Sequence, residues 1–310
     1  TSYPYILFEK QPEELASFLR GDSWAGLNVT IPYKEAVIPY CDALSDEASE
    51  IGAVNTIVRD GERLIGHNTD YAGFRHLLCQ NDVPVQGANC LVLGSGGASK
   101  TVQCVLRDLG AAKVTVVSRS GDVNYTNASQ QQDAEIPVNT TPIGMYPNNG
   151  QAPLYPGSFT RLQWAVDVIY NPLRTNLLCQ ANKAGMETVG GLGMLIGQGI
   201  AAAELFLGRA IPQTIGAKIE KDMLLEKENI VLIGMPGVGK TTVGMEIADG
   251  MGREFYDIDQ MIVYDDGREI PQIFAEEGEE YFRQLEQKIV LSLANVTGAV
   301  IACGGGVVTR

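Results

Sequence analysis

The stretch that decides the fold is CLVLGSGGASKTVQCVLRDLGAAKVTVVSR, residues 90–119. Its apolar opening, residues 91–93, leads into a glycine-rich turn, a helical pattern follows, and Gly110 is placed to end that helix. Residues 114–117, VTVV, are rich in β-branched side chains and predict the next strand. The order strand, glycine-rich turn, helix and strand predicts a βαβ unit, and therefore an α/β protein with a parallel sheet.

The glycines of this turn indicate a ligand. Gly94 permits a tight turn, and Gly96 lets backbone amides approach a pyrophosphate at the N-terminus of the following helix. We therefore expect a dinucleotide here. An NAD site of this kind places an acidic residue at the end of the second strand, whereas this chain has Arg119 between two serines. An arginine suits a 2′-phosphate, which predicts NADP.

Composition excludes several classes of function. The 310 residues leave room for two domains, and 45% hydrophobic residues suffice for real cores. With 37 acidic against 23 basic residues the net charge is −14, which argues against nucleic acid or an anionic membrane as a partner. No apolar run approaches the length of a membrane span, and no signal peptide is visible. Small molecules remain as the expected partners, and nothing in the sequence fixes an oligomeric state.

Cysteine and histidine usage indicates the compartment. The 6 cysteines form no CxxC pair, and with 2 histidines they cannot make a zinc site of standard spacing. We expect reduced, mostly buried cysteines in a cytoplasmic protein. Because the chain starts at Thr1 and ends at Arg310 in mid-pattern, we also expect that terminal segments are absent.

Polar residues recur at the expected ends of strands in the first eighty residues. Asn28 and Thr30 lie just before a proline and Lys34, and the Asn-Thr pairs 55–56 and 68–69 are each expected directly after an apolar strand. Ligands of α/β proteins bind at the ends of the strands, so these residues predict the rim of a polar pocket. Taken alone, this stretch favours the plainer interpretation of Lys34 as a surface lysine that precedes a helix.

A series of sequence blocks, found in the same order, resembles the shikimate dehydrogenase family. The blocks are NVTIPYK (28–34), GAVNT (52–56), NTD (68–70), GSGGA (94–98), VNTTPIGM (138–145) and GLGMLIGQ (191–198). The resemblance runs from about Tyr5 to Pro212 and implies the reduction of 3-dehydroshikimate to shikimate with NADPH. The family carries a Ser-x-Ser pair for the substrate carboxylate on an early strand, and nothing before Tyr5 matches it, so we expect part of the pocket to be missing.

The resemblance also implies roles for single residues. Lys34 and Asp70 would be the catalytic pair, because a lysine ammonium can protonate the alkoxide left by hydride arrival while the carboxylate orients it. Thr30, Asn55 and Gln198 would hold substrate hydroxyls. The residues implied for NADP are Gly94, Ser95, Gly96, Gly97, Ala98, Ser118, Arg119, Ser120, Asn139, Thr140, Thr141 and Met194. The stretch 192–208 predicts an apolar helix that is buried on most faces, where Met194 and Phe206 are read equally well as plain core.

A second glycine loop lies further along the chain. Residues 229–233 predict a buried strand, and GMPGVGKTT (234–242) then fits the P-loop pattern in its strand-to-helix context, which predicts ATP and Mg²⁺ as ligands. Backbone amides around Gly237, Gly239 and Thr242 would cradle phosphate, Lys240 would reach the β and γ oxygens, and the Thr241 hydroxyl would bind Mg²⁺.

The blocks FYDID (255–259), EYFRQLE (280–286) and GGG (304–306) resemble shikimate kinase. The resemblance implies Asp257 in the Mg²⁺ shell, Asp259 and Arg283 as shikimate ligands, and the triplet Gly304, Gly305 and Gly306 beneath shikimate. The plainer interpretation of Asp257 and Asp259 is a solvated strand end. Only the first half of that family is matched, so we expect kinase chemistry to be impaired in this chain.

The sequence thus predicts a dehydrogenase fused to part of a kinase. The expected domains are 1–86 with 191–212 for substrate, 87–190 as a Rossmann domain for NADP, 213–228 as a partly helical linker, and 229–310 as a partial P-loop domain. One alternative is an NAD-linked quinate or shikimate dehydrogenase, against which Arg119 and the attached kinase region argue. Another is a dehydrogenase whose P-loop region only binds nucleotide.

Overall fold

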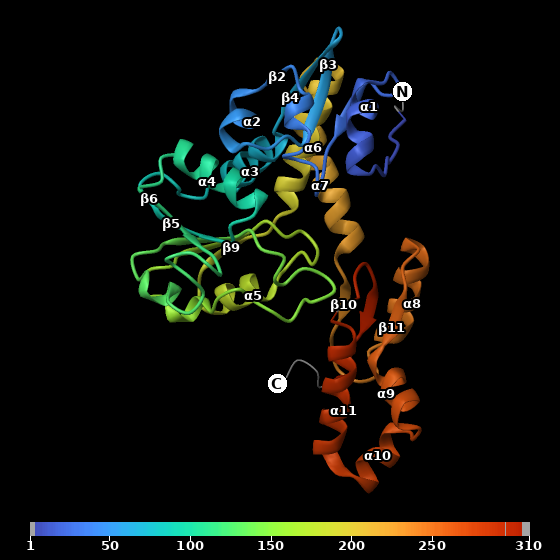
Figure 1. Cartoon of the computed structure of the whole chain (residues 1–310). Coiled ribbons are helices and arrows are strands. Elements are labelled where there is room, and N and C mark those ends of the chain that lie inside the picture. Colours follow the sequence, from blue (N-terminus) through green and yellow to red (C-terminus); the bar gives the residue numbers. More distant parts are fainter. Residues whose placement is uncertain (1–3, 295, 306–310) are drawn as a thin grey trace. The chain divides into compact units, whose positions relative to one another are not determined.

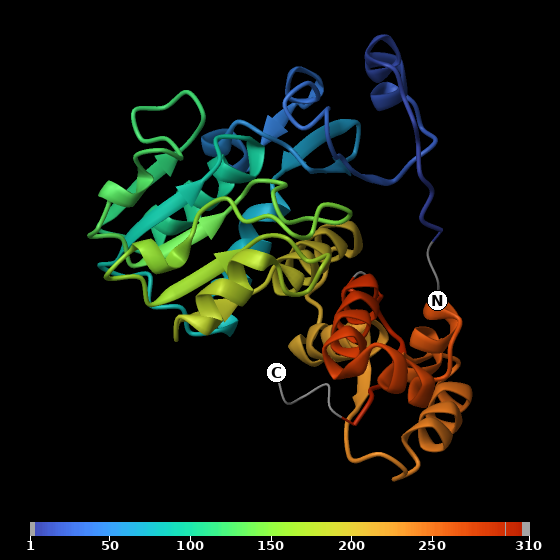
Figure 2. The same cartoon turned by 90° about the horizontal axis from the view of Figure 1, so that it is seen from below.

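The computed structural model describes residues 4–294 and 296–305, shown in Figures 1 and 2. The chain forms two compact units, Thr1–Ala217 and Lys218–Arg310, which are described separately below. No helix within the described ranges is both long enough and apolar enough to cross a membrane.

The first unit contains two sheets and the helices that cover them. Its elements are α1 (Leu15–Arg20), β1 (Gly26–Asn28), β2 (Ala43–Leu44), α2 (Asp46–Ile51), β3 (Thr56–Asp60), β4 (Arg63–His67), α3 (Thr69–Gln80), β5 (Asn89–Leu93), α4 (Gly97–Asp108), β6 (Lys113–Val117), β7 (Ile136–Asn139), β8 (Trp164–Asp167), α5 (Asn176–Lys183), β9 (Glu187–Val189) and α6 (Leu192–Leu207). Helix α7 (Gln213–Lys227) crosses into the second unit, so the expected partly helical linker is a helix over almost its whole length.

The predicted βαβ unit, β5-α4-β6, is confirmed and forms part of a five-stranded sheet of order β6-β5-β7-β8-β9. All its pairings are parallel. Along β5 the side chains alternate: Cys90 and Val92 belong to the core shared with α3 and α4, and Leu91 and Leu93 to the core shared with α5. Figure 1 shows α4 and α5 on opposite faces of the sheet.

The strand order of this sheet fixes where a ligand can bind. From β5 the chain continues first to β6 on one side and then to β7 on the other, so the connections leave in opposite directions between β5 and β7. In open α/β sheets the crevice at such a switch point, outside the carboxyl ends of the strands, receives the ligand. The glycine-rich turn follows β5 and the Asn139 loop follows β7, so both lie at this crevice.

The smaller sheet has the order β1-β3-β4-β2 and corrects one prediction. Asn55 and Thr56 were expected after a strand, but Thr56 begins β3 and Asn55 directly precedes it. Because β3 runs antiparallel to β4, Thr56 pairs with His67 at the end of β4, immediately before the Asn68-Thr69 pair. The two Asn-Thr pairs still meet, through antiparallel pairing rather than through two parallel strand ends.

Helices α3 and α6 pack closely because glycines line their contact. A Cβ atom added to Gly73 would lie 2.5 Å from the Met194 carbonyl oxygen, and one added to Gly197 would lie 3.0 Å from the Gly73 Cα. The expectation that α6 is buried on most faces is wrong, since Phe206 is 37% exposed and only the α3 side and scattered positions are buried.

The second unit is a smaller parallel sheet of order β10-β12-β11 with helices around it. Its elements are β10 (Ile230–Leu232), α8 (Lys240–Met251), β11 (Phe255–Asp257), α9 (Ile258–Asp266), α10 (Ile270–Glu276), α11 (Gly278–Ser292) and β12 (Val300–Ala302). The prediction of a buried strand at 229–233 is wrong, because Val231 is 51% exposed and β10, within the described residues, pairs with β12 alone. The central strand β12 is fully buried.

The cysteines are free thiols, as expected. The expectation that most are buried holds for Cys90, Cys104 and Cys303, whereas Cys79 and Cys179 are exposed.

Candidate functional site

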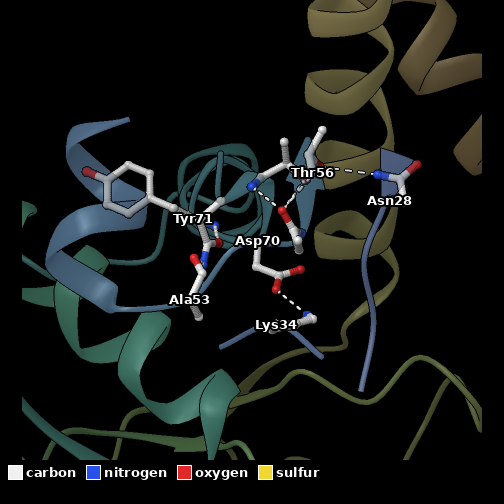
Figure 3. A network of polar contacts seen from close by, with 9 residues as sticks. Asn28, Lys34, Ala53, Thr56, Asp70 and Tyr71 are labelled. Atoms are coloured by element: carbon white, nitrogen blue, oxygen red, sulfur yellow. Dashed lines mark hydrogen bonds and ion pairs between the residues drawn. The ribbon is translucent and has the colours of Figure 1, made fainter. Parts of the chain in front are cut away.

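Lys34 and Asp70 form a close ion pair. The Lys34 Nζ donates to Asp70 Oδ2 at 2.6 Å, with side chains 29% and 13% exposed, and Figure 3 shows the two side chains pointing toward each other. Asp70 lies in the first turn of α3, where a helix dipole favours an acid. Asn68 fixes that turn, because its side chain accepts from the Tyr71 amide as the N-cap and donates to the Ala53 carbonyl.

A polar network lies beside this pair. Asn55 Oδ1 accepts from the Thr69 amide at 2.7 Å and from the hydroxyls of Thr56 and Thr69 at 3.2 Å. The Asn28 amide donates to the Thr56 hydroxyl, as Figure 3 shows. These bonds draw the starts of β3 and α3 and the end of β1 to one place.

The expected substrate ligands come from separate segments of the chain, of which Asn55 belongs to this network. The Val29 amide donates to the Asn55 carbonyl at 2.7 Å, and the next residue, Thr30, is exposed. Gln198 lies against α3, because its backbone nitrogen would be 2.8 Å from a Cβ atom added to Gly73. Gly73 follows Asp70 by less than one helical turn.

The glycine-rich turn fits a dinucleotide. Gly94 has a φ of +108°, a left-handed conformation that favours glycine, and an added Cβ would lie 2.9 Å from the Thr140 hydroxyl. Gly96 and Gly97 have no atom within 4 Å of where a Cβ would be, and α4 begins there without a side-chain cap. Its first amides are therefore open to an anion, as at other helix N-termini that hold pyrophosphate.

The remaining expected NADP residues divide into exposed and buried ones. Arg119 and Ser120 are exposed beyond the end of β6, while Ser118 is buried. Asn139 is fully buried, and its amide donates to both carboxylate oxygens of Asp167 at 3.1 Å. The Asn139 side chain is therefore bonded within the protein, and its expected place in the lining of the cofactor cleft stays a prediction.

Other expected residues remain at the crevice. Thr140 and Thr141 pack against Gly94, and the Thr140 hydroxyl donates to the Leu93 carbonyl at 2.7 Å. Met194 is partly buried against the core that α3 and α4 share with the sheet, so the plainer interpretation of this residue as core is the one that the packing supports.

Two features of this region were missed from the sequence. Asp167 is fully buried at the end of β8, and burial raises its pKa to about 6. The sequence pattern that could have pointed to Asp167 is a carboxylate at the end of an apolar strand. Lys100 on α4 forms a 2.7 Å ion pair with Glu35, the residue after Lys34, and this hydrogen bond lowers the pKa of Glu35. No local pattern could have paired residues so far apart in the chain.

The second unit holds a P-loop arrangement. Lys240 Nζ donates to the carbonyls of Gly234 and Met235 at 3.0 Å, and the Thr241 hydroxyl donates to Asp257 Oδ2 at 2.6 Å. Gly239 has a φ of +89° and open space at its Cβ position. Gly237 and Thr242 lie in the same loop and at the start of α8.

These residues fit a nucleotide with Mg²⁺. A hydroxyl and a carboxylate are the protein ligands that a nucleotide-bound Mg²⁺ uses, and Thr241 and Asp257 are already in contact. In the part of the chain that the structure describes, no cluster of three or more His, Cys, Asp or Glu residues could hold a metal alone.

The expected shikimate ligands of this unit meet around Glu286, which sequence analysis did not single out. Arg283 donates to Glu286 Oε2 at 2.8 Å, and a Cβ on Gly304 would lie 2.7 Å from Asp259 Oδ1 and 3.0 Å from Glu286 Oε1. Burial, and then the charges of Asp257 and Glu286, raise the pKa of Asp259. The signal for Glu286 was its spacing three residues after Arg283 on a helix.

The glycine triplet is only partly described. A Cβ on Gly305 would lie 2.6 Å from Pro236, so the end of β12 approaches the P-loop closely. Gly306 lies outside the described residues.

Comparisons with known proteins agree with this geometry. The family model "Shikimate dehydrogenase substrate binding domain" matches residues 1–57, and the model "Shikimate kinase" matches residues 236–310. The shikimate dehydrogenase (NADP(+)) of Moorella thermoacetica is 35% identical over 247 residues, which cover 71% of this chain and 83% of that protein.

Solved structures show the same fold. A chorismate mutase/shikimate 5-dehydrogenase fusion protein from Clostridium acetobutylicum is 35% identical with a TM-score of 0.67, over 70% of this chain and 84% of that one. A shikimate 5-dehydrogenase from Thermus thermophilus in complex with NADP(H) and shikimate is 33% identical with a TM-score of 0.59, over 68% and 83%. The chain therefore belongs to the shikimate dehydrogenase family and carries, after that part, a region that matches shikimate kinase.

Proposed function

We propose that the first unit reduces 3-dehydroshikimate to shikimate with NADPH. The observation that carries this proposal is the 2.6 Å pair of Lys34 and Asp70, in the same unit as the glycine-rich turn at the sheet's switch point. The relative from Moorella, named for NADP(+), and the Thermus complex with NADP(H) and shikimate support it.

The residues of the unit would perform the following chemistry. When bound, NADPH supplies a hydride to the carbonyl carbon. The Lys34 ammonium donates its proton to the oxygen that becomes an alkoxide, and Lys34 regains a proton from solvent, to which it is partly open. Asp70 orients Lys34 and compensates its charge, while Thr30, Asn55 and Gln198 bind hydroxyl groups of the substrate.

In this function different segments of the chain bind the substrate and the cofactor. In our proposal residues 1–86 and 191–212 hold the substrate and residues 87–190 hold the cofactor. The network around Asn55 and the turn at Gly94 support the two assignments respectively.

The proposal distinguishes NADP from NAD through Arg119. Arg119 is exposed at the end of β6, where a 2′-phosphate would lie and where charge-assisted hydrogen bonds are strong. We expect Arg119→Ala to raise the KM for NADPH at least about tenfold while leaving the KM for NADH nearly unchanged. Arg161→Ala, at an exposed arginine of the same region that pairs with Glu135, is the matched control.

Steady-state assays decide between this proposal and its rival. Turnover of 3-dehydroshikimate with NADPH supports the proposal, whereas preferred oxidation of quinate with NAD would establish the NAD-linked alternative. An equal loss for both cofactors in Arg119→Ala would remove this residue from cofactor choice.

We also propose that, in the complete protein, the second unit belongs to a domain that phosphorylates shikimate with ATP and Mg²⁺. The contact between Thr241 and Asp257 and the meeting of Asp259, Arg283 and Gly304 favour this function. The alternative is a nucleotide-binding module without transfer activity.

A further inference from the structure

Asp167 ends strand β8 as a fully buried carboxylate with several hydrogen-bond partners. Its oxygens accept from the Asn139 amide group at 3.1 Å, from the Ile169 backbone amide at 3.0 Å and from the Thr175 hydroxyl at 2.7 Å. These partners come from the last residue of β7, the loop after β8 and the N-cap of α5. One carboxylate therefore joins three segments at the carboxyl edge of the sheet.

The partners demand an acceptor at this position. The Asn139 NH₂ group and the Ile169 backbone amide can only donate, and the Thr175 hydroxyl, whose oxygen also caps α5 by accepting from the Leu178 amide, donates to Asp167 Oδ2. An ionised carboxylate satisfies all these donors. A protonated acid or a carboxamide keeps one acceptor position fewer, so its hydrogen would face the Asn139 NH₂ group or make the Thr175 hydroxyl turn from donor to acceptor.

From Asp167 a chain of hydrogen bonds leads to the crevice. Asn139 Oδ1 accepts from the amide of Thr141 at 3.0 Å and from its hydroxyl at 2.7 Å, and that hydroxyl accepts from the Ile143 amide at 3.2 Å. Thr140, which lies between Asn139 and Thr141 in the chain, packs against Gly94 of the glycine-rich turn. The loop 139–143 is thus fixed at one end by Asp167 and lies against the cofactor turn at its middle.

We propose that Asp167 is a positioning residue that, through Asn139, holds the loop 139–143 in the shape that receives the nicotinamide dinucleotide. Asp167 itself does not touch the cofactor, since it is fully buried. The inference rests on the proposed function only in taking the crevice as the NADP site.

The protonation of Asp167 provides a signature of this role. Burial raises its pKa to about 6, opposed by the hydrogen bonds from Ile169, Thr175 and Asn139. The charged or titratable side chains on the segments around it are exposed: Tyr146, Tyr170, Arg174, Cys179, Lys183 and Glu187. Below about pH 6 the Asp167 carboxyl group gains a proton and therefore loses an acceptor position. The loop 139–143 is then held less firmly.

The first test measures the loop directly and needs no cofactor. Amide hydrogen exchange at Thr141 and Ile143, corrected for intrinsic rates, should be about tenfold faster in Asp167→Asn than in the wild type. The wild type itself should lose this protection as the pH falls through about 6. The control Asp133→Asn makes the same chemical change at an exposed carboxylate and should leave this exchange unchanged.

The second test measures NADP⁺ binding by calorimetry between pH 5.5 and 7.5. We expect Asp167→Asn to bind about tenfold more weakly at pH 7.5. The 2′-phosphate also titrates near pH 6, so the informative quantity is the difference between the two proteins: the affinity of the wild type should fall further on acidification.

A double variant tests the pairing with Asn139. In Asp167→Asn with Asn139→Asp, the new carboxylate at 139 accepts from Thr141 and from the new amide at 167, so protection and NADP⁺ affinity should recover in part. Recovery supports the proposal. Lack of recovery in exchange, in a double variant that melts like the wild type, would overturn it.

The outcomes separate this inference from the proposed function. If Asp167→Asn melts at a lower temperature but keeps wild-type exchange at Thr141 and Ile143 and wild-type affinity, Asp167 only stabilises the sheet and the inference is wrong. If Asp167→Asn does not fold, the pH dependence of exchange in the wild type decides. If the wild type bound no NADP⁺, the proposed function would fail, while exchange would still show whether Asp167 holds the loop.

Discussion

At the scale of single residues, Lys34 carries the proposed chemistry. We expect Lys34→Ala to lower kcat for 3-dehydroshikimate reduction by about 10²–10⁴, the usual contribution of a positioned acid–base group, with NADPH affinity nearly unchanged. Steady-state assays that follow the absorbance of NADPH measure kcat, and the KM for NADPH from the same assays reports on NADPH binding.

The matched control for this prediction is Lys113→Ala, at an exposed lysine of the same unit that also pairs with an aspartate. It should keep wild-type kinetics. A Lys34→Ala enzyme with normal kcat and a raised KM for substrate would make Lys34 a binding residue rather than the proton donor.

At the scale of elements, the approach of α3 to α6 brings Gln198 beside the turn that bears Asp70. A Cβ on Gly73 would overlap the Met194 carbonyl and the Gln198 amide, which are backbone atoms and cannot move without shifting a helix. We expect Gly73→Ala to destabilise the first unit by about 1–3 kcal/mol, the usual cost of overpacking, and to raise the KM for substrate. Scanning calorimetry of the transition of the first unit measures the stability.

Gly199 provides the control on the same pair of helices. It lies inside α6 with no atom within 4 Å of its Cβ position, so Gly199→Ala should stabilise the unit by about 0.4–1 kcal/mol through the unfolded state. If both variants shifted stability in the same direction, the close contact at Gly73 would not be what holds the helices together.

At the scale of the whole molecule, the two units should carry separable activities. In the complete protein we expect Asp259→Asn to lower shikimate-dependent ADP release about a hundredfold, because the carboxylate near Gly304 would no longer orient the acceptor hydroxyl, and to leave 3-dehydroshikimate reduction unchanged. A coupled ADP assay and NADPH absorbance measure the two rates on one sample.

Asp265→Asn, at an acid of the same unit that pairs with Lys288 on the surface, should leave both rates unchanged. Unaltered phosphorylation in Asp259→Asn would remove this residue from the acceptor site. Absence of shikimate-dependent ADP release in the complete wild-type protein would favour the nucleotide-binding module instead.

Several features could be predicted from the sequence because they depend on residues close together in the chain. The βαβ unit at 90–119 follows from short-range periodicity and from glycines whose backbone freedom the turn at Gly94 requires. The P-loop follows in the same way, since strand, loop and helix are consecutive there. The residues of the Lys34 and Asp70 pair came from the family resemblance rather than from any local pattern.

Only the tertiary structure decided how distant segments meet. Lys34 and Asp70 are separated by 36 positions, and their 2.6 Å contact exists because a turn after β1 and the first turn of α3 converge. The antiparallel pairing of β3 with β4, and not the expected strand ends, brought Asn55 to Thr69. Side-chain patterns determine which face of an element is apolar, but they do not determine which elements share an edge.

Burial is the other property that the chain alone did not determine. Asn139 was expected to line the cofactor cleft, and in the structure it is buried, with its side-chain amide donating to Asp167 on the neighbouring strand. The strand at 229–233 was expected to be buried and is half exposed, because burial depends on how many neighbours a strand has in its sheet. A residue type fixes what a side chain can donate or accept, whereas the packing around it decides whether a ligand or the protein itself receives that bond.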